Sequence, residues 1–175
     1  MRTETEVRDA GPAFVDFEAS GLHDESYPVE VGWALPWGPS GSILIRPATE
    51  WLSWGWDMKA ERIHGITRED VVRDGASPAD VAAALLAATG RRPLHSDNPD
   101  HDRNWLTKLC RVAGINVSEV RDAKKLMEAL AAERGHGEVA MQRAKLLAAR
   151  ESKPVHRAGP DARYLATLYR ILAEN

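Results

Sequence analysis

The stretch Ala13-Phe-Val-Asp-Phe-Glu-Ala-Ser-Gly-Leu22 decides how the rest of this chain is interpreted. Its apolar residues are typical of a buried strand, yet it carries two carboxylates, Asp16 and Glu18. Side chains two positions apart on a strand share a face, so both acids point the same way from one rigid backbone. Like charges held that close repel each other, and a pair of hard divalent ions such as Mg²⁺ or Mn²⁺ would relieve the repulsion. The stretch therefore predicts a metal site, whereas a single acid here would be explained by an edge strand facing water.

Length and composition limit the class of protein. The chain has 175 residues and a formal net charge of −3, which predicts one compact domain over residues 1–175 with a flexible tail at 1–11. A negative net charge gives no overall positive field that would attract nucleic acid. It does not exclude nucleic-acid binding, because an acidic metal site lowers the net charge and a basic patch can be local. The one cysteine, Cys110, cannot form an internal disulfide, which indicates a small core residue and a reducing, cytoplasmic setting.

No membrane association is expected. The longest apolar stretch, residues 81–88, is far shorter than the roughly 20 residues that a bilayer span requires. Residues 1–10 are charged and polar and lack the apolar core of a signal peptide.

Turn residues and periodicity predict a mixed order of strands and helices. The first three strands, at 13–22, 29–35 and 42–46, have short connections and are predicted to form an antiparallel meander. Three helices follow at 58–64, 67–75 and 77–89, then strands at 93–96 and 116–120 around a helix that starts near residue 102. The chain is predicted to end with helices at 122–134, at 138–150 and from residue 159 onward.

Two of these helices each carry one aspartate at the inner end of an apolar stripe. Apolar residues follow Asp102, and likewise Asp161, at four, seven and eleven positions, which is the inward face of a helix. Taken alone, a first-turn aspartate is explained as a helix-capping charge, and a loop histidine such as His156 as a surface residue. Taken together, the two acids of the strand and the two aspartates at the inner ends of the helices can converge on one pair of cations.

Three tryptophans lie close together in the segment 47–56, which is predicted to be a loop. Trp51, Trp54 and Trp56 are explained equally well as a small satellite core and as a surface that stacks on flat ligands. The sequence leaves both alternatives open.

The chain resembles the DEDD 3′–5′ exonucleases, the group of oligoribonuclease, ribonuclease T and the DNA polymerase III proofreading subunit. The stretch from Asp16 to Leu22 is similar to the first motif of that family, Asp-x-Glu-x-x-Gly-Leu. Residues 97–102, Asp-Asn-Pro-Asp-His-Asp, resemble the second motif, His-Asn-Ala-x-Phe-Asp, with Asp97 in place of histidine and His101 in place of phenylalanine.

Two further signatures complete the resemblance. Residues 156–161, His-Arg-Ala-Gly-Pro-Asp, match the third motif, His-x4-Asp, and residues 63–67 resemble the His-Gly-Ile segment that family members carry between the first two motifs. All four signatures occur in family order between Phe14 and Tyr169. Arg157 stands where the tyrosine-bearing branch has its tyrosine, so the resemblance is to the histidine-bearing branch, DEDDh.

The resemblance implies an α/β, ribonuclease H-like fold with a central mixed five-stranded sheet, its first three strands antiparallel, flanked by helices. It also implies two-metal hydrolysis of single-stranded RNA or DNA from the 3′ end, with release of nucleoside 5′-monophosphates. Asp16, Glu18, Asp102 and Asp161 would hold two Mg²⁺ or Mn²⁺ ions. His156 would be the general base, because the histidine side chain in general has a pKa of about 6.5.

Candidate substrate-binding residues come from the same motifs: Phe17, Ser20, Leu22, His64, Ile66 and Asn98. Phe17 and Ile66 are explained equally well as core residues. Two other functions fit the same signatures, a catalytically silent nucleic-acid-binding module and a metal-dependent phosphodiesterase for small nucleotides. Family members of this size are often dimers, which leaves a homodimer open.

Overall fold

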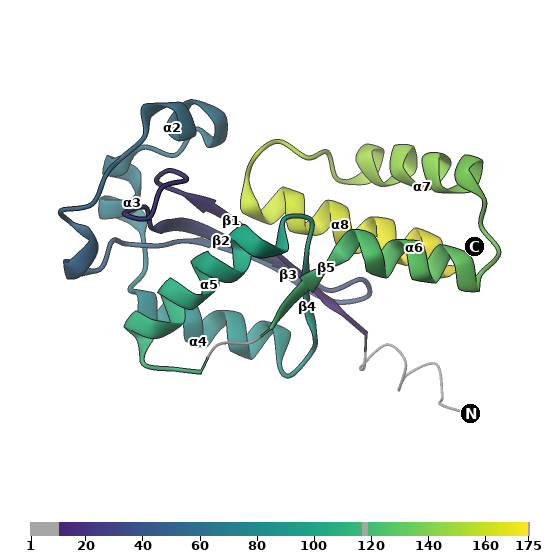
Figure 1. The fold of residues 1–175 in the computed structure, drawn as a ribbon, viewed down its shortest axis with the longest axis horizontal. Helices are drawn as coiled ribbons and strands as arrows, with labels where there is room; N and C mark the ends of the chain where they lie inside the picture. The colour runs from purple at the N-terminus through teal and green to yellow at the C-terminus, as the bar shows by residue number, and fades with distance from the viewer. Residues whose placement is uncertain (1–10, 117–118, 175) are drawn as a thin grey trace.

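The computed structural model describes residues 11–116 and 119–174, which form a central sheet with helices on both faces (Figure 1). The strands are β1 (Ala13–Ala19), β2 (Pro28–Ala34), β3 (Ser40–Leu44), β4 (Leu94–Ser96) and β5 (Val120–Asp122). The helices are the 3-10 turn η1 (Thr49–Trp51), α2 (Met58–His64), α3 (Arg68–Asp74), α4 (Pro78–Thr89), α5 (Pro99–Ala113), α6 (Ala123–Glu133), α7 (Glu138–Glu151) and α8 (Ala158–Glu174).

The sheet has the predicted topology. Its strand order is β3-β2-β1-β4-β5, with β2 antiparallel to both β1 and β3, and with β4 parallel to both β1 and β5. The mixed five-stranded sheet, its antiparallel meander and its flanking helices are therefore confirmed.

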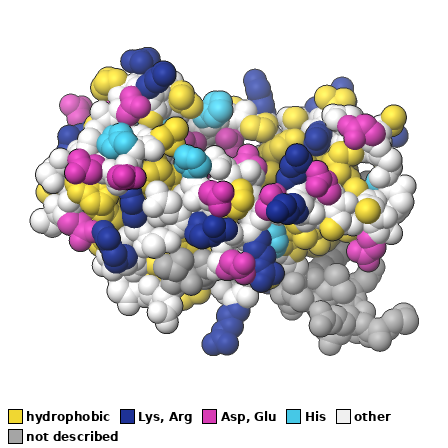
Figure 2. Space-filling model, viewed as in Figure 1, with side chains coloured by type: hydrophobic (Ala, Val, Ile, Leu, Met, Phe, Trp, Pro, Cys, Tyr) yellow, Lys and Arg dark blue, Asp and Glu magenta, His cyan; other side chains and the backbone are white. Residues whose placement is uncertain are grey.

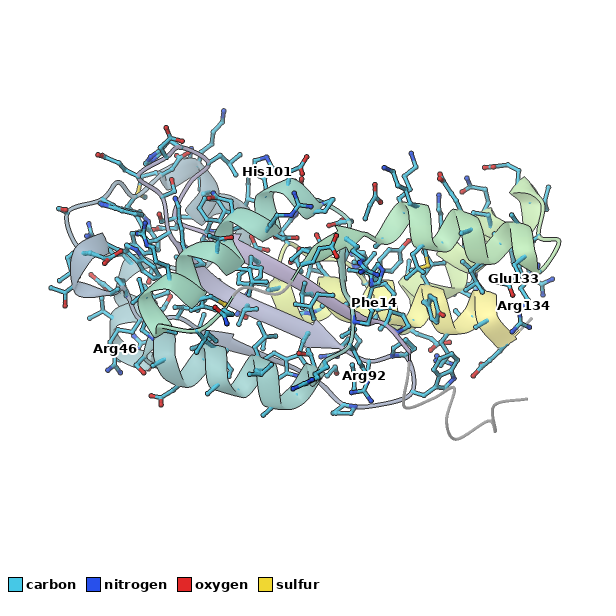
Figure 3. All side chains as sticks on the ribbon, turned by 60° about the horizontal axis from the view of Figure 1, so that its bottom comes forward. Phe14, Arg46, Arg92, His101, Glu133 and Arg134 are labelled. Carbon is cyan, nitrogen blue, oxygen red and sulfur yellow. The ribbon has the colours of Figure 1, made fainter. Side chains whose placement is uncertain are left out.

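The two faces of β1 contact different helices. Ala13, Val15 and Phe17 belong to the core on the side of α4 and α5, whereas Phe14 packs with residues of α6, α7 and α8 on the other side. Figure 3 shows this layering, with α4 and α5 in front of the sheet and α8 behind it. Because side chains alternate along a strand, Asp16 and Glu18 share the α8 face with Phe14, as predicted.

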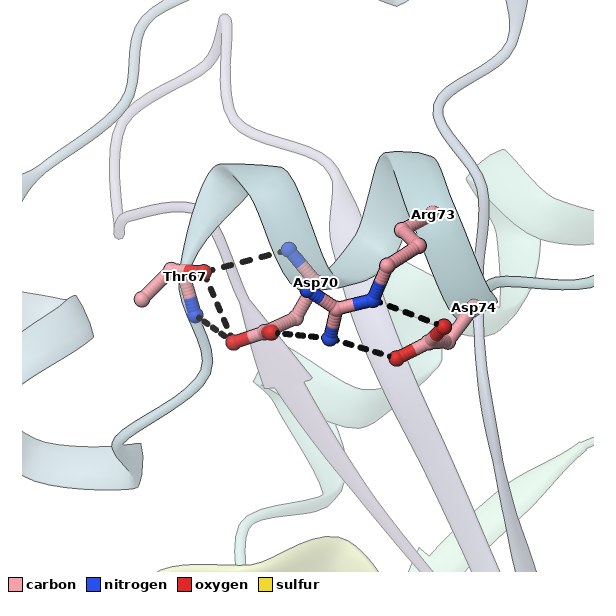
Figure 4. Close-up of polar contacts among 4 residues, drawn as sticks. All are labelled: Thr67, Asp70, Arg73 and Asp74. Carbon is pink, nitrogen blue, oxygen red and sulfur yellow. Dashed lines mark hydrogen bonds and ion pairs between the residues drawn. The ribbon is translucent and has the colours of Figure 1, made fainter.

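Helix ends follow the predicted capping residues. In α3 the Thr67 hydroxyl accepts a hydrogen bond from the Asp70 amide, and the Asp70 carboxylate accepts one from the Thr67 amide, a complete capping box (Figure 4). In α4 the Ser77 side chain caps the helix and Pro78 occupies its first turn. Among the helices of residues 11–116 and 119–174, none combines the length and apolarity of a membrane span.

Several predicted boundaries differ from the structure. The third strand spans Ser40–Leu44 rather than 42–46, because it pairs with β2 in an antiparallel register that begins with Ser40 opposite Ala34 and ends with Leu44 opposite Glu30. The helix at Asp102 begins three residues earlier, at Pro99, whose restricted φ suits a first helical turn. The strand predicted at 116–120 is instead Val120–Asp122. Residues 117–118 of the predicted strand lie outside the described residues. The predicted tail at 1–11 also lies outside them, apart from Gly11.

The tryptophan segment and the cysteine contribute to the core. Trp51 is fully buried, and its ring stacks on Tyr27 with centroids 5.7 Å apart. Trp54 and Trp56 are half-buried against the same cluster, so the core explanation of these tryptophans holds. Cys110 is buried, as predicted.

The first turn of α8 lies directly against β2. A Cβ atom built on Gly32 would lie 2.1 Å from the backbone carbonyl of Ala158, well inside van der Waals contact. Gly32 pairs across the sheet with Asp16, on the same face of the sheet. Glycine at this position therefore allows the start of α8 to reach the strand that carries the acids.

We expect Gly32→Ala to destabilise the fold by about 3 kcal/mol or more, because backbone rather than a flexible side chain must move to admit the methyl group. Urea unfolding of the variant measures this. Gly137→Ala is the matched control, since a Cβ there meets nothing within 4 Å. Equal losses in both variants would contradict the close approach of α8 to β2.

Candidate active site

Four acids from distant parts of the chain meet at the carboxyl end of β1. Ligand atoms of Asp16, Glu18 and Asp161 lie within 4.8 Å of one another, and so do those of Asp16, Asp97 and Asp102. Asp16 belongs to both groups and joins them. In Figure 2 acidic and histidine side chains gather around the hollow between the part that carries α2 and the part that carries α6, α7 and α8. The structure therefore brings together all four acids that the motifs predicted, and adds Asp97.

The acids line a cleft of about 430 Å³. Its walls come from α2, the end of β1, the start of α5 and the loop before α8, where His156 lies. Leu22 and Ile63 line it although their side chains are 76% and 57% exposed. The cleft therefore has an exposed apolar surface beside a row of carboxylates.

The electrostatics of the cluster are unfavourable without cations. Burial, followed by the charges of Asp102 and Glu18, raises the pKa of Asp16 well above its ordinary value. Burial and the charge of Asp161 raise the pKa of Glu18 to about 8, and burial raises that of Asp102 to about 7. Each of these carboxylates is therefore harder to ionise than a carboxylate in water.

Asp102 is held in place at the start of α5. It is 3% exposed, and one of its oxygens accepts a hydrogen bond from the Ser96 hydroxyl. Ser96 ends β4, and its hydroxyl also accepts a hydrogen bond from the Asn98 amide at 2.9 Å. The end of β4 thereby orients the acid that the helix carries.

Asp161 organises the loop that carries His156. Its two carboxylate oxygens accept hydrogen bonds from the backbone amides of Val155 at 2.8 Å and His156 at 3.2 Å. His156 is exposed and has a φ of 55°, an uncommon conformation for a residue other than glycine. Such backbone strain persists where its surroundings impose it and is often found at functional sites.

An ion pair between buried Glu30 and partly exposed Arg157 fixes the same loop to the sheet. Glu30 on β2 is 2% exposed and accepts two hydrogen bonds from the Arg157 guanidinium, both at 2.9 Å, and one from the Ala158 amide at 3.1 Å. Glu30 pairs across the sheet with Glu18. Arg157, next to His156 in the chain, is thus connected to the strand beside the acids.

Three predicted substrate-binding residues are buried. His64 is 5% exposed; its Nδ1 accepts a hydrogen bond from the Ile66 amide, and its Nε2 lies 3.3 Å from the Ala19 carbonyl. Burial lowers the pKa of His64, so this ring, which also lines the cleft, favours its neutral form. Ile66 is a core residue, and the Ser20 hydroxyl accepts a hydrogen bond from the Tyr27 amide. Neither Ile66 nor Ser20 is among the cleft-lining residues of the described chain.

The other three substrate candidates line the cleft. They are Phe17, which also belongs to the core, Leu22 and Asn98. Sequence reasoning missed further lining residues: Lys59, Ile63, Asp97, His101 and Trp105. Figure 3 shows His101 at the start of α5, away from Arg46 and Arg92. The only signal in the sequence was the departure of Asp97 and His101 from the second motif.

The donor set fits hard divalent cations. Six carboxylates line the cleft, those of Asp16, Glu18, Asp57, Asp97, Asp102 and Asp161. Lys59 is the one lysine or arginine among the lining residues of the described chain. Oxygen donors with this excess of negative charge suit Mg²⁺ or Mn²⁺. Without cations, the same charge would repel a phosphodiester.

Comparison with solved structures shows the fold. The chain is similar to E. coli exonuclease I in a zinc-bound complex with single-stranded DNA (18% identity, TM-score 0.64, 92% of this chain and 40% of that chain). It is also similar to E. coli exonuclease I with a dA16 oligonucleotide (15%, 0.66, 93% and 40%) and to apo exonuclease I (16%, 0.64, 94% and 42%). The chain thus spans about two fifths of these chains. No protein-family model matches it, and no curated protein matches it in sequence.

We expect Arg157→Ala to lower the free energy of unfolding by about 3 kcal/mol, because Glu30 would remain buried without its cation. Urea unfolding measures the loss. Arg73→Ala is the control, since Arg73 is 65% exposed and pairs with Asp70 and Asp74 on the surface (Figure 4), where solvent screens the interaction and a much smaller loss is expected. Similar losses in the two variants would contradict a structural role for the Glu30 pair.

We expect the contribution of this cluster to the stability of the metal-free protein to fall as the pH rises. The pKa values of Asp16, Glu18 and Asp102 are higher in the folded than in the unfolded chain, so the folded state binds more protons. This loss of stability extends from about pH 4, near the pKa of a carboxyl in the unfolded chain, to about pH 8, the pKa of Glu18 in the folded chain.

Thermal unfolding of the metal-free protein checks this expectation. Mg²⁺ or Mn²⁺ should raise the Tm more at pH 8 than at pH 5.5. Each kcal/mol that the cation adds to the free energy of unfolding should raise the Tm by about 2–4 °C. Asp16→Asn, which removes the acid shared by both groups, should flatten the pH dependence. A cation effect of equal size at both pH values in the unmodified chain would argue against the cluster as its origin.

Proposed function

We propose that this protein is a metal-dependent 3′–5′ exonuclease that hydrolyses single-stranded nucleic acid and releases nucleoside 5′-monophosphates. The observation that carries the proposal is the convergence of Asp16, Glu18, Asp102 and Asp161 beside His156 in one cleft. The exonuclease I structures that share its fold include complexes with single-stranded DNA, which supports a single strand as the substrate.

The carboxylates would hold two divalent cations, Mg²⁺ or Mn²⁺. When bound, these cations would supply Lewis-acid activation of the attacking water and charge stabilisation for the leaving 3′ oxygen. His156 would accept a proton from the attacking water, since it is exposed and lines the cleft, and histidine is the side chain most often used as a general base. Asp161 and the Glu30–Arg157 pair hold the loop that carries the imidazole.

The walls of the cleft suit a terminal nucleotide. Leu22 and Ile63 would offer an exposed apolar surface for a base. Lys59, which belongs to α2, offers a positive charge for a phosphate oxygen. A nucleotide at a free 3′ end can enter such a site without the strand separation that a duplex would require.

Asp16→Asn and Asp161→Asn should reduce the release of mononucleotides to the level seen with EDTA, because each removes a carboxylate from the candidate cation site. The measurement is digestion of 3′- and 5′-labelled single-stranded RNA and DNA with Mg²⁺, Mn²⁺ or EDTA. Asp24→Asn, an exposed acid outside the cleft, is the control and should keep full activity.

His156→Ala should slow hydrolysis by about 10²–10⁴-fold while leaving cation binding intact. Unchanged turnover of this variant at pH 7 would exclude His156 as the base. Cleavage of model diesters without any cleavage of oligomers would instead indicate a phosphodiesterase for small nucleotides. Binding of single strands without hydrolysis would indicate a silent binding module.

A further inference from the structure

Asp97 is the acid in the cleft that the second motif does not account for. It directly follows β4, which pairs in parallel with β1 through Leu94 with Ala13 and His95 with Phe14. Continuing this register by two residues sets Asp97 beside Asp16. The backbone of the sheet, rather than a chance side-chain rotamer, therefore brings the fifth carboxylate to the cluster.

The five carboxylates form two groups of three. One group contains Asp16, Glu18 and Asp161, and the other contains Asp16, Asp97 and Asp102. We propose that Asp97 is a direct ligand of a divalent cation that it shares with Asp16 and Asp102, so that each of the two cations has three carboxylates and Asp16 serves both. This inference rests on the proposed function, whose cation site it completes.

The environment of Asp97 lacks the partners of an ordinary surface acid. In the part of the chain that the structure describes, no lysine, arginine or histidine forms an ion pair with Asp97, Asp16 or Asp102. Asp97 is exposed, and no side chain of the described residues donates a hydrogen bond to its carboxylate. Asp100, three residues further on, is by contrast paired with Arg103 at 3.1 Å.

The other two members of the group also have free ligand capacity. Asp16 is partly buried, and no hydrogen bond or ion pair from the described residues reaches its carboxylate. Asp102 accepts hydrogen bonds from the Ser96 hydroxyl and from the backbone of Phe17, and it lies within reach of Asp16 and Asp97. Three hard oxygen donors facing one another without a basic side chain are the arrangement that a divalent cation stabilises.

Titration calorimetry and the electron paramagnetic resonance of Mn²⁺ test the proposal without any measurement of activity. The unmodified protein should bind two Mn²⁺ ions. Asp97→Asn should weaken one of these sites by about 10–100-fold and leave the other within about twofold. Asp100→Asn is the matched control, because it removes the same charge from the same segment outside the cleft, and should retain both affinities.

Thermal unfolding provides a second readout that also shows whether the variant folds. Asp97→Asn removes one negative charge from a repulsive cluster, so the Tm of the metal-free variant should be equal to or above that of the unmodified protein. Its increase in Tm with Mn²⁺ should be smaller. A general loss of stability would instead lower the metal-free Tm.

The outcomes separate this inference from the function on which it rests. If the unmodified protein binds two Mn²⁺ ions and degrades single strands, but Asp97→Asn binds both ions with unchanged affinity, Asp97 is not a ligand and the proposed function stands. If the unmodified protein neither binds Mn²⁺ nor degrades single strands, the proposed function fails first.

Discussion

The contact between the first turn of α8 and β2 is the constraint on which the candidate site depends. Gly32 leaves no side chain between the strand and the Ala158 carbonyl, and Glu30 binds both the Arg157 guanidinium and the Ala158 amide. Asp16 and Glu18 lie directly across the sheet from these two residues. The docking of one helix end on one strand therefore delivers Asp161 and His156 to the acids of β1.

The site is costly for the folded protein in electrostatic terms. Carboxylates from three elements are held together where burial and mutual repulsion both disfavour ionisation. Apolar packing on both faces of the sheet holds them there, through Val15 and Phe17 on one side and Phe14 on the other. The free energy of the core thus maintains a charge arrangement that protonation or bound cations would relieve, so cation binding would stabilise the fold.

The wall of the cleft is supported by aromatic packing behind it. The Lys108 ammonium lies 5.0 Å from the Trp54 ring centroid and 4.9 Å from that of Trp105, and it donates hydrogen bonds to the carbonyls of Asp24 and Ser26. This side chain ties α5 to the loop that follows Leu22. Trp54 and Trp105 thus hold Lys108 where it connects these two segments.

Local sequence determined much of this protein: the two acids on one face of β1, the caps of α3 and α4, and the aspartates at the inner ends of α5 and α8 all follow from alternation, helical period and capping chemistry. The predicted ends of the strands were less accurate, because pairing with β2 determines where β3 begins. Only the tertiary structure decided that Asp97 joins the acids and that Glu30 holds the His156 loop. It also decided that Ile66 and the tryptophans of residues 51–56 pack into the core. These outcomes depend on which distant segments pair and pack, as Arg157 does with Glu30 127 residues away, and no local pattern encodes such contacts.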